Sequence, residues 1–222
     1  MSNCGGGSPE GIAAMAQFGN TKQCYGIVAM ALHWGMAGLL AGLVVLGLYA
    51  AQLPDVGFDK TKIRLVLLHK ELGILALMLA GLRLAWRVGN ALPRLVEGLP
   101  EWQQVVARFV HLCLYALMFA QPVTGWVMSS AAGIPVSFFG LFYLPDLVRY
   151  DEYLFRFLLA LHQWLGYALT LLVALHVGAA LEHHFVLRDE TLRKMLPARA
   201  RTDGLSPRGR ARTRPLPSAP SR

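Results

Sequence analysis

The chain has 222 residues, of which 55% are hydrophobic and only 15% are charged, and its mean hydropathy is +0.44. A soluble globular domain of this length needs more polar surface, so the composition predicts an integral membrane protein. The net charge of +8 comes largely from an Arg- and Pro-rich C-terminal tail and indicates contact with anionic lipid headgroups, not a nucleic-acid partner.

The chain begins with a Gly-rich segment, residues 1–21, that we predict to be flexible. Four apolar runs follow, and each is long enough to cross a hydrocarbon core of about 30 Å as a helix. They occupy residues 26–50, 66–88, 105–129 and 156–182. The sequence therefore predicts an all-α membrane protein, a bundle of four transmembrane helices within residues 22–196, followed by a disordered tail at 197–222.

Two local features interrupt these runs. Pro122 falls inside the third run and is expected to kink that helix, which membrane helices tolerate. The connector before the fourth run contains an aromatic stretch, residues 137–150, that we expect to lie at the outer membrane interface.

The basic residues are unequally divided between the two sides that four spans create. Most of the 21 lysine and arginine residues belong to the side that holds both termini. Because cytoplasmic segments carry an excess of Lys and Arg, this bias predicts a multi-pass protein of the bacterial inner membrane with both termini in the cytoplasm. We call that side inner and the opposite side outer.

Histidines recur within these apolar runs, where ionisable side chains are rare and indicate function. A single one would be explained by a hydrogen bond between helices. Four of the seven histidines, however, share the pattern L-H-x-x-x-[G/A], which leaves space one helical turn from the ring. These four are His33, His69, His162 and His176, whereas His111, His183 and His184 lack the small residue.

The four histidines form two pairs by depth. His33 and His176 lie at one level near the inner face, and His69 and His162 lie at one level near the outer face. The two on the fourth run are fourteen residues apart, about 21 Å along a helix, and face the same side. An imidazole pair without Cys, Asp or Glu does not suit zinc, but suits an iron whose other four ligands come from a porphyrin. We therefore predict two non-covalent, bis-histidine heme b groups stacked across the bilayer. Their six-coordinate irons have no open position, which favours electron transfer.

Basic residues near these pairs are candidate partners of the heme propionates. Arg83 lies fourteen residues after His69, on the same helix face and at the level of the inner heme. Near His69, a second group could hold the outer propionates, steer a small anion to the heme edge, or be an ordinary lysine-rich helix start. This group consists of Lys60, Lys62, Arg64 and Lys70, of which Arg64 is assigned to the cofactor, and no catalytic residue is predicted.

Three segments resemble the bacterial cytochrome b561 family of four-helix, di-heme membrane proteins. They are NTKQCYGIVAMALHW, LLHKELGIL with LRLAWR, and HQWLGYALTLLVALHVGAALEHHFVLRDETLRKML, so that the resemblance covers roughly residues 20–196. It implies iron ligands on the first, second and fourth helices, hence His33, His69, His162 and His176, and none on the third, which leaves out His111. It also implies electron exchange with the quinone pool and, in one type, oxidation of superoxide with reduction of ubiquinone.

We therefore expect a di-heme cytochrome that carries single electrons across the inner membrane, exchanges them with ubiquinone and, in a narrower form, oxidises superoxide at the periplasmic face. Two alternatives are open. One is a heme-bearing membrane anchor for a separate dehydrogenase or periplasmic redox protein, and the other is a histidine-lined transporter of metal ions or protons. The sequence predicts neither an oligomeric state nor a role for His183 and His184.

Overall fold

The computed structural model describes residues 18–20, 25–54, 60–91, 93, 100–189 and 191–196. Most of the segment expected to be flexible, at 1–21, and all of the tail expected to be disordered, at 197–222, lie outside these residues. Both expectations therefore stay predictions.

Four long helices make up the body of the protein. They are α1 (Ile27–Gln52), α2 (Lys60–Gly89), α3 (Glu101–Ala131) and α4 (Glu152–Phe185). Each is long and apolar enough to span a membrane, which confirms the four predicted spans. The helices extend past the apolar runs, most of all α2 and α4, because the polar residues that flank the runs continue the helical turns instead of ending them.

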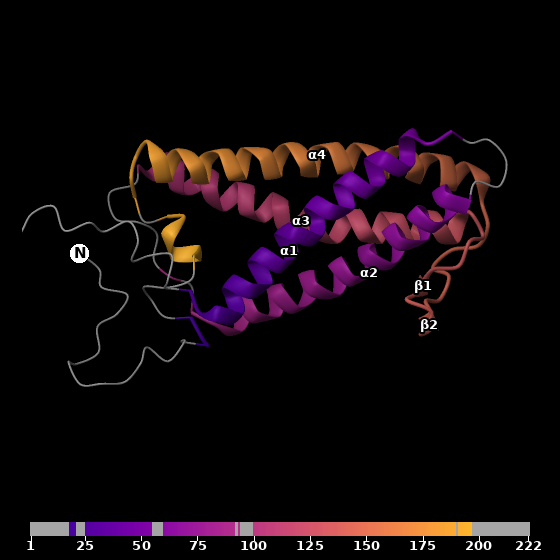
Figure 1. Cartoon of the computed structure of the whole chain (residues 1–222), viewed down its shortest axis with the longest axis horizontal. Helices are drawn as coiled ribbons and strands as arrows, with labels where there is room; N and C mark the ends of the chain where they lie inside the picture. The colour runs from indigo at the N-terminus through magenta and orange to yellow at the C-terminus, as the bar shows by residue number, and fades with distance from the viewer. Residues whose placement is uncertain are drawn as a thin grey trace, which may run out of the picture.

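Figure 1 shows the helices running along the long axis of the molecule. At one end, β1 (Ser137–Phe138) pairs antiparallel with β2 (Phe142–Tyr143). At the other end, where α1 begins and α4 finishes, lies the short 3-10 helix η1 (Arg193–Met195). We call these the hairpin end and the terminal end.

The helices pack in chain order. The close contacts join α1 to α2, α2 to α3, and α3 to α4, whereas α4 makes few or no close backbone contacts with α1 or α2. A small buried core lies among the first three helices and consists of Met36, Leu43, Ala76, Ala80 and Met118. The fourth helix is therefore held mainly through α3.

Large apolar side chains point outward along the helices. Val45 of α1 and Leu112 of α3, for example, are each 67% exposed. In water such a surface would be costly, but in a bilayer the hydrocarbon chains cover it. The outward face therefore supports the expected contact with membrane lipid.

The junction between α3 and α4 is tied at both of its ends. Gly133, with φ of +66°, lets the Gly133 and Ile134 amides turn back and donate to the Ser130 and Ser129 carbonyls, which satisfies the last carbonyls of α3. The side chain of Asp151 accepts hydrogen bonds from the first amides of α4, and its own amide donates to the Ala131 carbonyl. The start of α4 is therefore fixed to the end of α3.

The aromatic stretch expected at 137–150 forms the hairpin and the loop that follows it. Phe139 and Gly140 both have positive φ, at 51° and 70°, and make the tight turn between β1 and β2. The Trp126 indole of α3 donates to the Pro145 carbonyl at 3.1 Å and holds the loop. The position of this stretch at a membrane interface stays a prediction.

Candidate functional site

The structure brings the four histidines of the L-H-x-x-x-[G/A] pattern together as two pairs. At the terminal end, the ring centres of His33 on α1 and His176 on α4 are 6.3 Å apart. At the hairpin end, those of His69 on α2 and His162 on α4 are 6.2 Å apart. Each pair thus joins α4 to one of the two helices against which α4 does not pack closely.

These distances fit a metal ion held between the two rings of each pair. An imidazole nitrogen binds a metal at about 2.0–2.1 Å and lies roughly 1.1 Å from its ring centre, so opposed imidazoles would have ring centres roughly 6.3 Å apart. Within the described parts of the chain, no cluster of three or more His, Cys, Asp or Glu side chains could hold a metal ion. The remaining ligands would then come from a bound group between the paired helices, where α4 makes few or no close backbone contacts with α1 or α2.

Two glycines back the rings of the hairpin-end pair. A Cβ atom on Gly47 of α1 would lie 3.0 Å from Cε1 of His69, and a Cβ atom on Gly125 of α3 would lie 3.1 Å from Cε1 of His162. By contrast, a Cβ atom on Gly73, one turn after His69, would meet nothing within 4 Å. The sequence pattern pointed to the small residue one turn away and missed both backing glycines, because they stand on other helices.

The helix without a paired histidine also contacts the hairpin-end pair. Gln121 and Thr124 of α3 both lie within hydrogen-bonding distance of His162 on α4. On the other side of the pair, Nδ1 of His69 is buried, lies beside the Leu43 backbone, and has no partner in hydrogen-bonding geometry. The two rings of this pair therefore have different surroundings.

Two arginines of α2, Arg83 and Arg87, lie towards the terminal end of the bundle. The Arg83 guanidinium donates to Nδ1 of His33 at 2.8 Å and, through Nε, to the Tyr115 hydroxyl at 3.3 Å. The Arg87 guanidinium lies 5.5 Å from the centre of the Tyr115 ring. Arg83 therefore contacts the terminal-end pair directly, whereas Arg87 stands beside Tyr115.

His111 of α3 is a further neighbour that the sequence pattern set aside. Its ring centre lies 5.2 Å from that of His176, too close for a metal ion bound between the two rings. Its Nδ1 donates to the Ala107 carbonyl at 2.6 Å. His111 therefore contacts the terminal-end pair without forming a pair of its own.

The four basic residues of the predicted outer group have different surroundings. Lys70, next to His69, donates from Nζ to Oγ of Ser129 at 2.7 Å, and that hydroxyl donates to the Ile134 carbonyl at 2.7 Å. Lys62 donates to the Leu53 carbonyl at 2.8 Å. Lys60 and Arg64 are exposed on the first turns of α2. The assignment of Arg64 to a cofactor stays a prediction.

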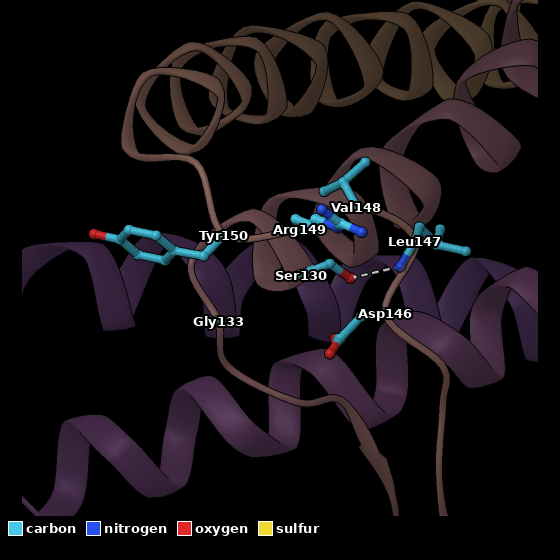
Figure 2. A pocket seen from close by; sticks show the side chains of 7 residues that line it. All are labelled: Ser130, Gly133, Asp146, Leu147, Val148, Arg149 and Tyr150. Carbon is cyan, nitrogen blue, oxygen red and sulfur yellow. Dashed lines mark hydrogen bonds between the residues drawn. The ribbon is translucent and has the colours of Figure 1, made fainter.

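A cavity of about 530 Å³ lies at the hairpin end, between the end of α3 and the loop that leads to α4. Figure 2 shows the residues around it, with the Leu147 amide donating to Oγ of Ser130. Its lining consists of Ser130, Gly133 and residues 146–150. None of the paired histidines lines it, so this cavity is separate from the histidine pairs.

The chain reverses direction just after α4 at the terminal end. Nδ1 of His183 donates to the Asp189 carboxylate at 2.5 Å, and the His183 side chain is only 18% exposed. Burial raises the pKa of the Asp189 carboxyl, but hydrogen bonds from His183 and Thr191 more than offset this and hold the pKa below its ordinary value. The Trp34 indole, beside His33, donates to the Met195 carbonyl at 2.8 Å. The segment after α4 is thereby fixed against α1.

Comparison with known proteins gives one family match and several relatives, each over most of the chain. Residues 24–198 match the family described as prokaryotic cytochrome b561. Cytochrome b561 homolog 2 of Escherichia coli (strain K12) is 36% identical over 179 residues, which cover 81% of this chain and 94% of that protein. Cytochrome b561 homolog 1 of the same strain is 31% identical over 174 residues, covering 76% and 94%. A Yersinia pestis protein named probable superoxide oxidase CybB is 27% identical over 173 residues, covering 78% and 96%.

Proposed function

The chain belongs to the prokaryotic cytochrome b561 family and is a membrane electron-transfer protein, and we propose that it moves single electrons across the inner membrane through two hemes. Family membership implies b-type heme. The observation that supports two such groups is the presence of two separate histidine pairs, with ring centres 6.3 and 6.2 Å apart. Each pair would hold one heme iron by its two imidazoles, without a covalent link.

Heme bound in this way would accept and release one electron at a time at its iron. The protein side chains determine where this takes place. His176 and His162 set the two sites fourteen residues apart on α4, and Leu169, midway between them, is buried with 3% exposure. Arg83 and Arg87 provide positive charge for propionates at the terminal-end site.

The direction of the protein in the membrane is part of this proposal. The excess of lysine and arginine on the side of the termini supports a cytoplasmic terminal end and a periplasmic hairpin end. Ubiquinone, which is soluble in lipid, is the proposed electron partner within the membrane. Reoxidation of the reduced protein by a ubiquinone analogue in vesicles supports ubiquinone as the partner. If the analogue does not reoxidise the reduced protein, ubiquinone is excluded.

The heme content of purified variants tests the two-site proposal. The wild-type protein should bind two hemes per chain and show b-type bands in a reduced-minus-oxidised spectrum. His176→Ala should lose the terminal-end heme and keep the other, whereas His111→Ala, the matched control on a neighbouring histidine, should keep both. One heme or none in the wild type contradicts the proposal. Loss of both hemes, or of neither, in His176→Ala contradicts the pairing.

Superoxide oxidation at the hairpin end is a second candidate function. It is supported by the relative named as a superoxide oxidase and by the basic residues at the start of α2. A cationic surface there would speed the approach of a small anion, and added salt would reduce the effect. Neutralising Lys60, Lys62 and Arg64 together should slow reduction of the hemes by superoxide in rapid mixing. An unchanged rate removes this candidate.

A heme-bearing anchor for a soluble redox protein remains the alternative from another class. It predicts that a soluble partner co-purifies from the native membrane in a fixed ratio to this chain. A chain that purifies alone and still exchanges electrons with ubiquinone contradicts it. The transporter alternative predicts ion flux without bound heme, so the same heme count tests it.

A further inference from the structure

We propose that Gln121 and Thr124, two side chains of α3, position the axial ligand His162 and tune the hairpin-end heme alone. This inference rests on the proposed di-heme function. It concerns α3, which carries none of the four paired histidines but contacts one of them, His162, at several atoms. The contacts join Thr124 Oγ1 to His162 Nδ1 at 3.2 Å, Gln121 Nε2 to the His162 carbonyl at 3.0 Å, and Gln121 Nε2 to His162 Nε2 at 3.3 Å.

The Thr124 hydroxyl determines which ring nitrogen of His162 carries the proton. A hydroxyl has one hydrogen to donate, and that of Thr124 goes to the Gln121 carbonyl at 2.9 Å. Its oxygen is therefore left to accept from Nδ1 of His162, which must carry the hydrogen. The lone pair then lies on Nε2, the arrangement in which an imidazole binds iron through Nε2 and donates through Nδ1.

Gln121 fixes the backbone from which that ring projects. Its amide donates to the His162 carbonyl at 3.0 Å, so α3 and α4 are tied together at the ligand itself. The amide has room because residue 166 is glycine: a Cβ atom there would lie 3.2 Å from Gln121 Nε2. The second contact of Gln121 Nε2, to His162 Nε2 at 3.3 Å, is at the long end of hydrogen bonding. It would be lost if Nε2 bound a metal, whereas the hydrogen bond to the His162 carbonyl would remain.

The opposite ligand of the same pair lacks this support. Nδ1 of His69 is buried beside the Leu43 backbone, and the described structure gives it no side-chain hydrogen-bond partner. At the terminal end, Nδ1 of His33 accepts from the Arg83 guanidinium, which places the hydrogen of the neutral ring on Nε2, so this contact would have to be released for Nε2 to bind iron. Thr124 forms its contact with His162, so loss of the hydroxyl should change the potential of the hairpin-end heme only.

The chemistry follows from what such a contact does to a ligand. An acceptor on Nδ1–H makes the imidazole a stronger electron donor, which favours Fe(III) over Fe(II), and loss of such partners typically weakens metal binding by about 10- to 100-fold. Thr124→Val should therefore weaken heme binding at the hairpin end by about that factor. It should also raise the midpoint potential of that heme, by about 59 mV for each tenfold change in the Fe(II)/Fe(III) equilibrium.

A redox titration of the purified holoprotein tests this inference, with heme per chain measured in parallel. Thr124→Val should shift one of the two potentials upward and leave the other unchanged, and Thr124→Ser, which keeps the hydroxyl, should restore the wild-type value. Gln121→Leu should lower heme affinity at the same site. The matched control is Thr170→Val, because the Thr170 hydroxyl donates to the carbonyl of Gly166 within α4 and has no hydrogen bond to a histidine of the described residues.

The outcomes separate this inference from the function on which it rests. A wild type with fewer than two hemes contradicts the proposed function. A wild type with two hemes, together with a Thr124→Val variant whose potentials are both unchanged or both shifted equally, overturns the positioning role alone. Failure of Thr124→Ser to restore the potential also overturns it, because the hydroxyl would then not be the group that acts.

Discussion

The glycines behind the hairpin-end rings give a sharp steric prediction. In Gly47→Ala and Gly125→Ala the new methyl carbon would lie 3.0 and 3.1 Å from Cε1 of His69 and His162, respectively. Ordinary carbon contacts lie at about 3.5–4.0 Å, so each ring must move by about 0.4–1.0 Å. A shift of either ring across the pair would change the 6.2 Å between ring centres, which is close to the distance needed for a metal held between them.

The expected cost follows from that displacement. Overpacking of a close-packed site costs about 1–3 kcal/mol, which corresponds to roughly 5- to 150-fold weaker heme binding at the hairpin end. The control is Gly42→Ala on α1, where a Cβ atom would meet nothing within 4 Å. This control should bind both hemes and gain up to about 1 kcal/mol of helix stability, because alanine favours a helix more than glycine does.

Heme titration of protein prepared without heme, followed by absorbance, measures both affinities. Gly47→Ala and Gly125→Ala should each lose one tight site and keep the other. If either variant binds two hemes as tightly as Gly42→Ala, the rings do not need the space behind them and the steric reasoning is refuted.

Three further predictions concern other parts of the molecule. Arg83→Gln removes a cation in contact with His33 and should lower the midpoint potential of the terminal-end heme by on the order of 100 mV at an effective dielectric of 20. A redox titration measures this shift, and an unchanged potential contradicts the contact. Ser129→Ala, at a site only 2% exposed, should leave the Lys70 ammonium without its partner and cost about 1–3 kcal/mol in thermal unfolding. Because the folded-state pKa of Asp189 is depressed, the stabilisation from its hydrogen bonds should be complete above about pH 4 and should weaken as the pH falls further. Hydrogen exchange at residues 186–196 should then become faster at low pH, and in Asp189→Asn this pH dependence should vanish.

Much of the fold could be predicted because the relevant signals are local. Span length and helical periodicity place residues by depth and by face, so they indicated which histidines meet across the bundle. The same reasoning placed Arg83 near His33, because fourteen residues are close to a whole number of helical turns. The four spans followed from apolar runs alone.

The contacts that sequence reasoning missed all depend on how one helix is set against another. Gly47, Gly125, Gln121 and Thr124 meet their histidines across helix interfaces, and no fixed spacing along the chain connects the partners. His111 was set aside because it lacks the small residue one turn away, yet it lies beside His176. Helix ends were also missed, since charged residues at the start of α2 continue the helix.

The position of both α4 histidines has a consequence for how the protein is made. α4 is the last of the four helices to leave the ribosome, and each pair takes one of its rings from α4. A nascent chain that ends before residue 152 has His33 and His69 but lacks the paired rings of His176 and His162. If each pair holds a heme as proposed, neither heme could be bound by both of its imidazoles during early synthesis, and both sites would be completed only when the final helix enters the bilayer.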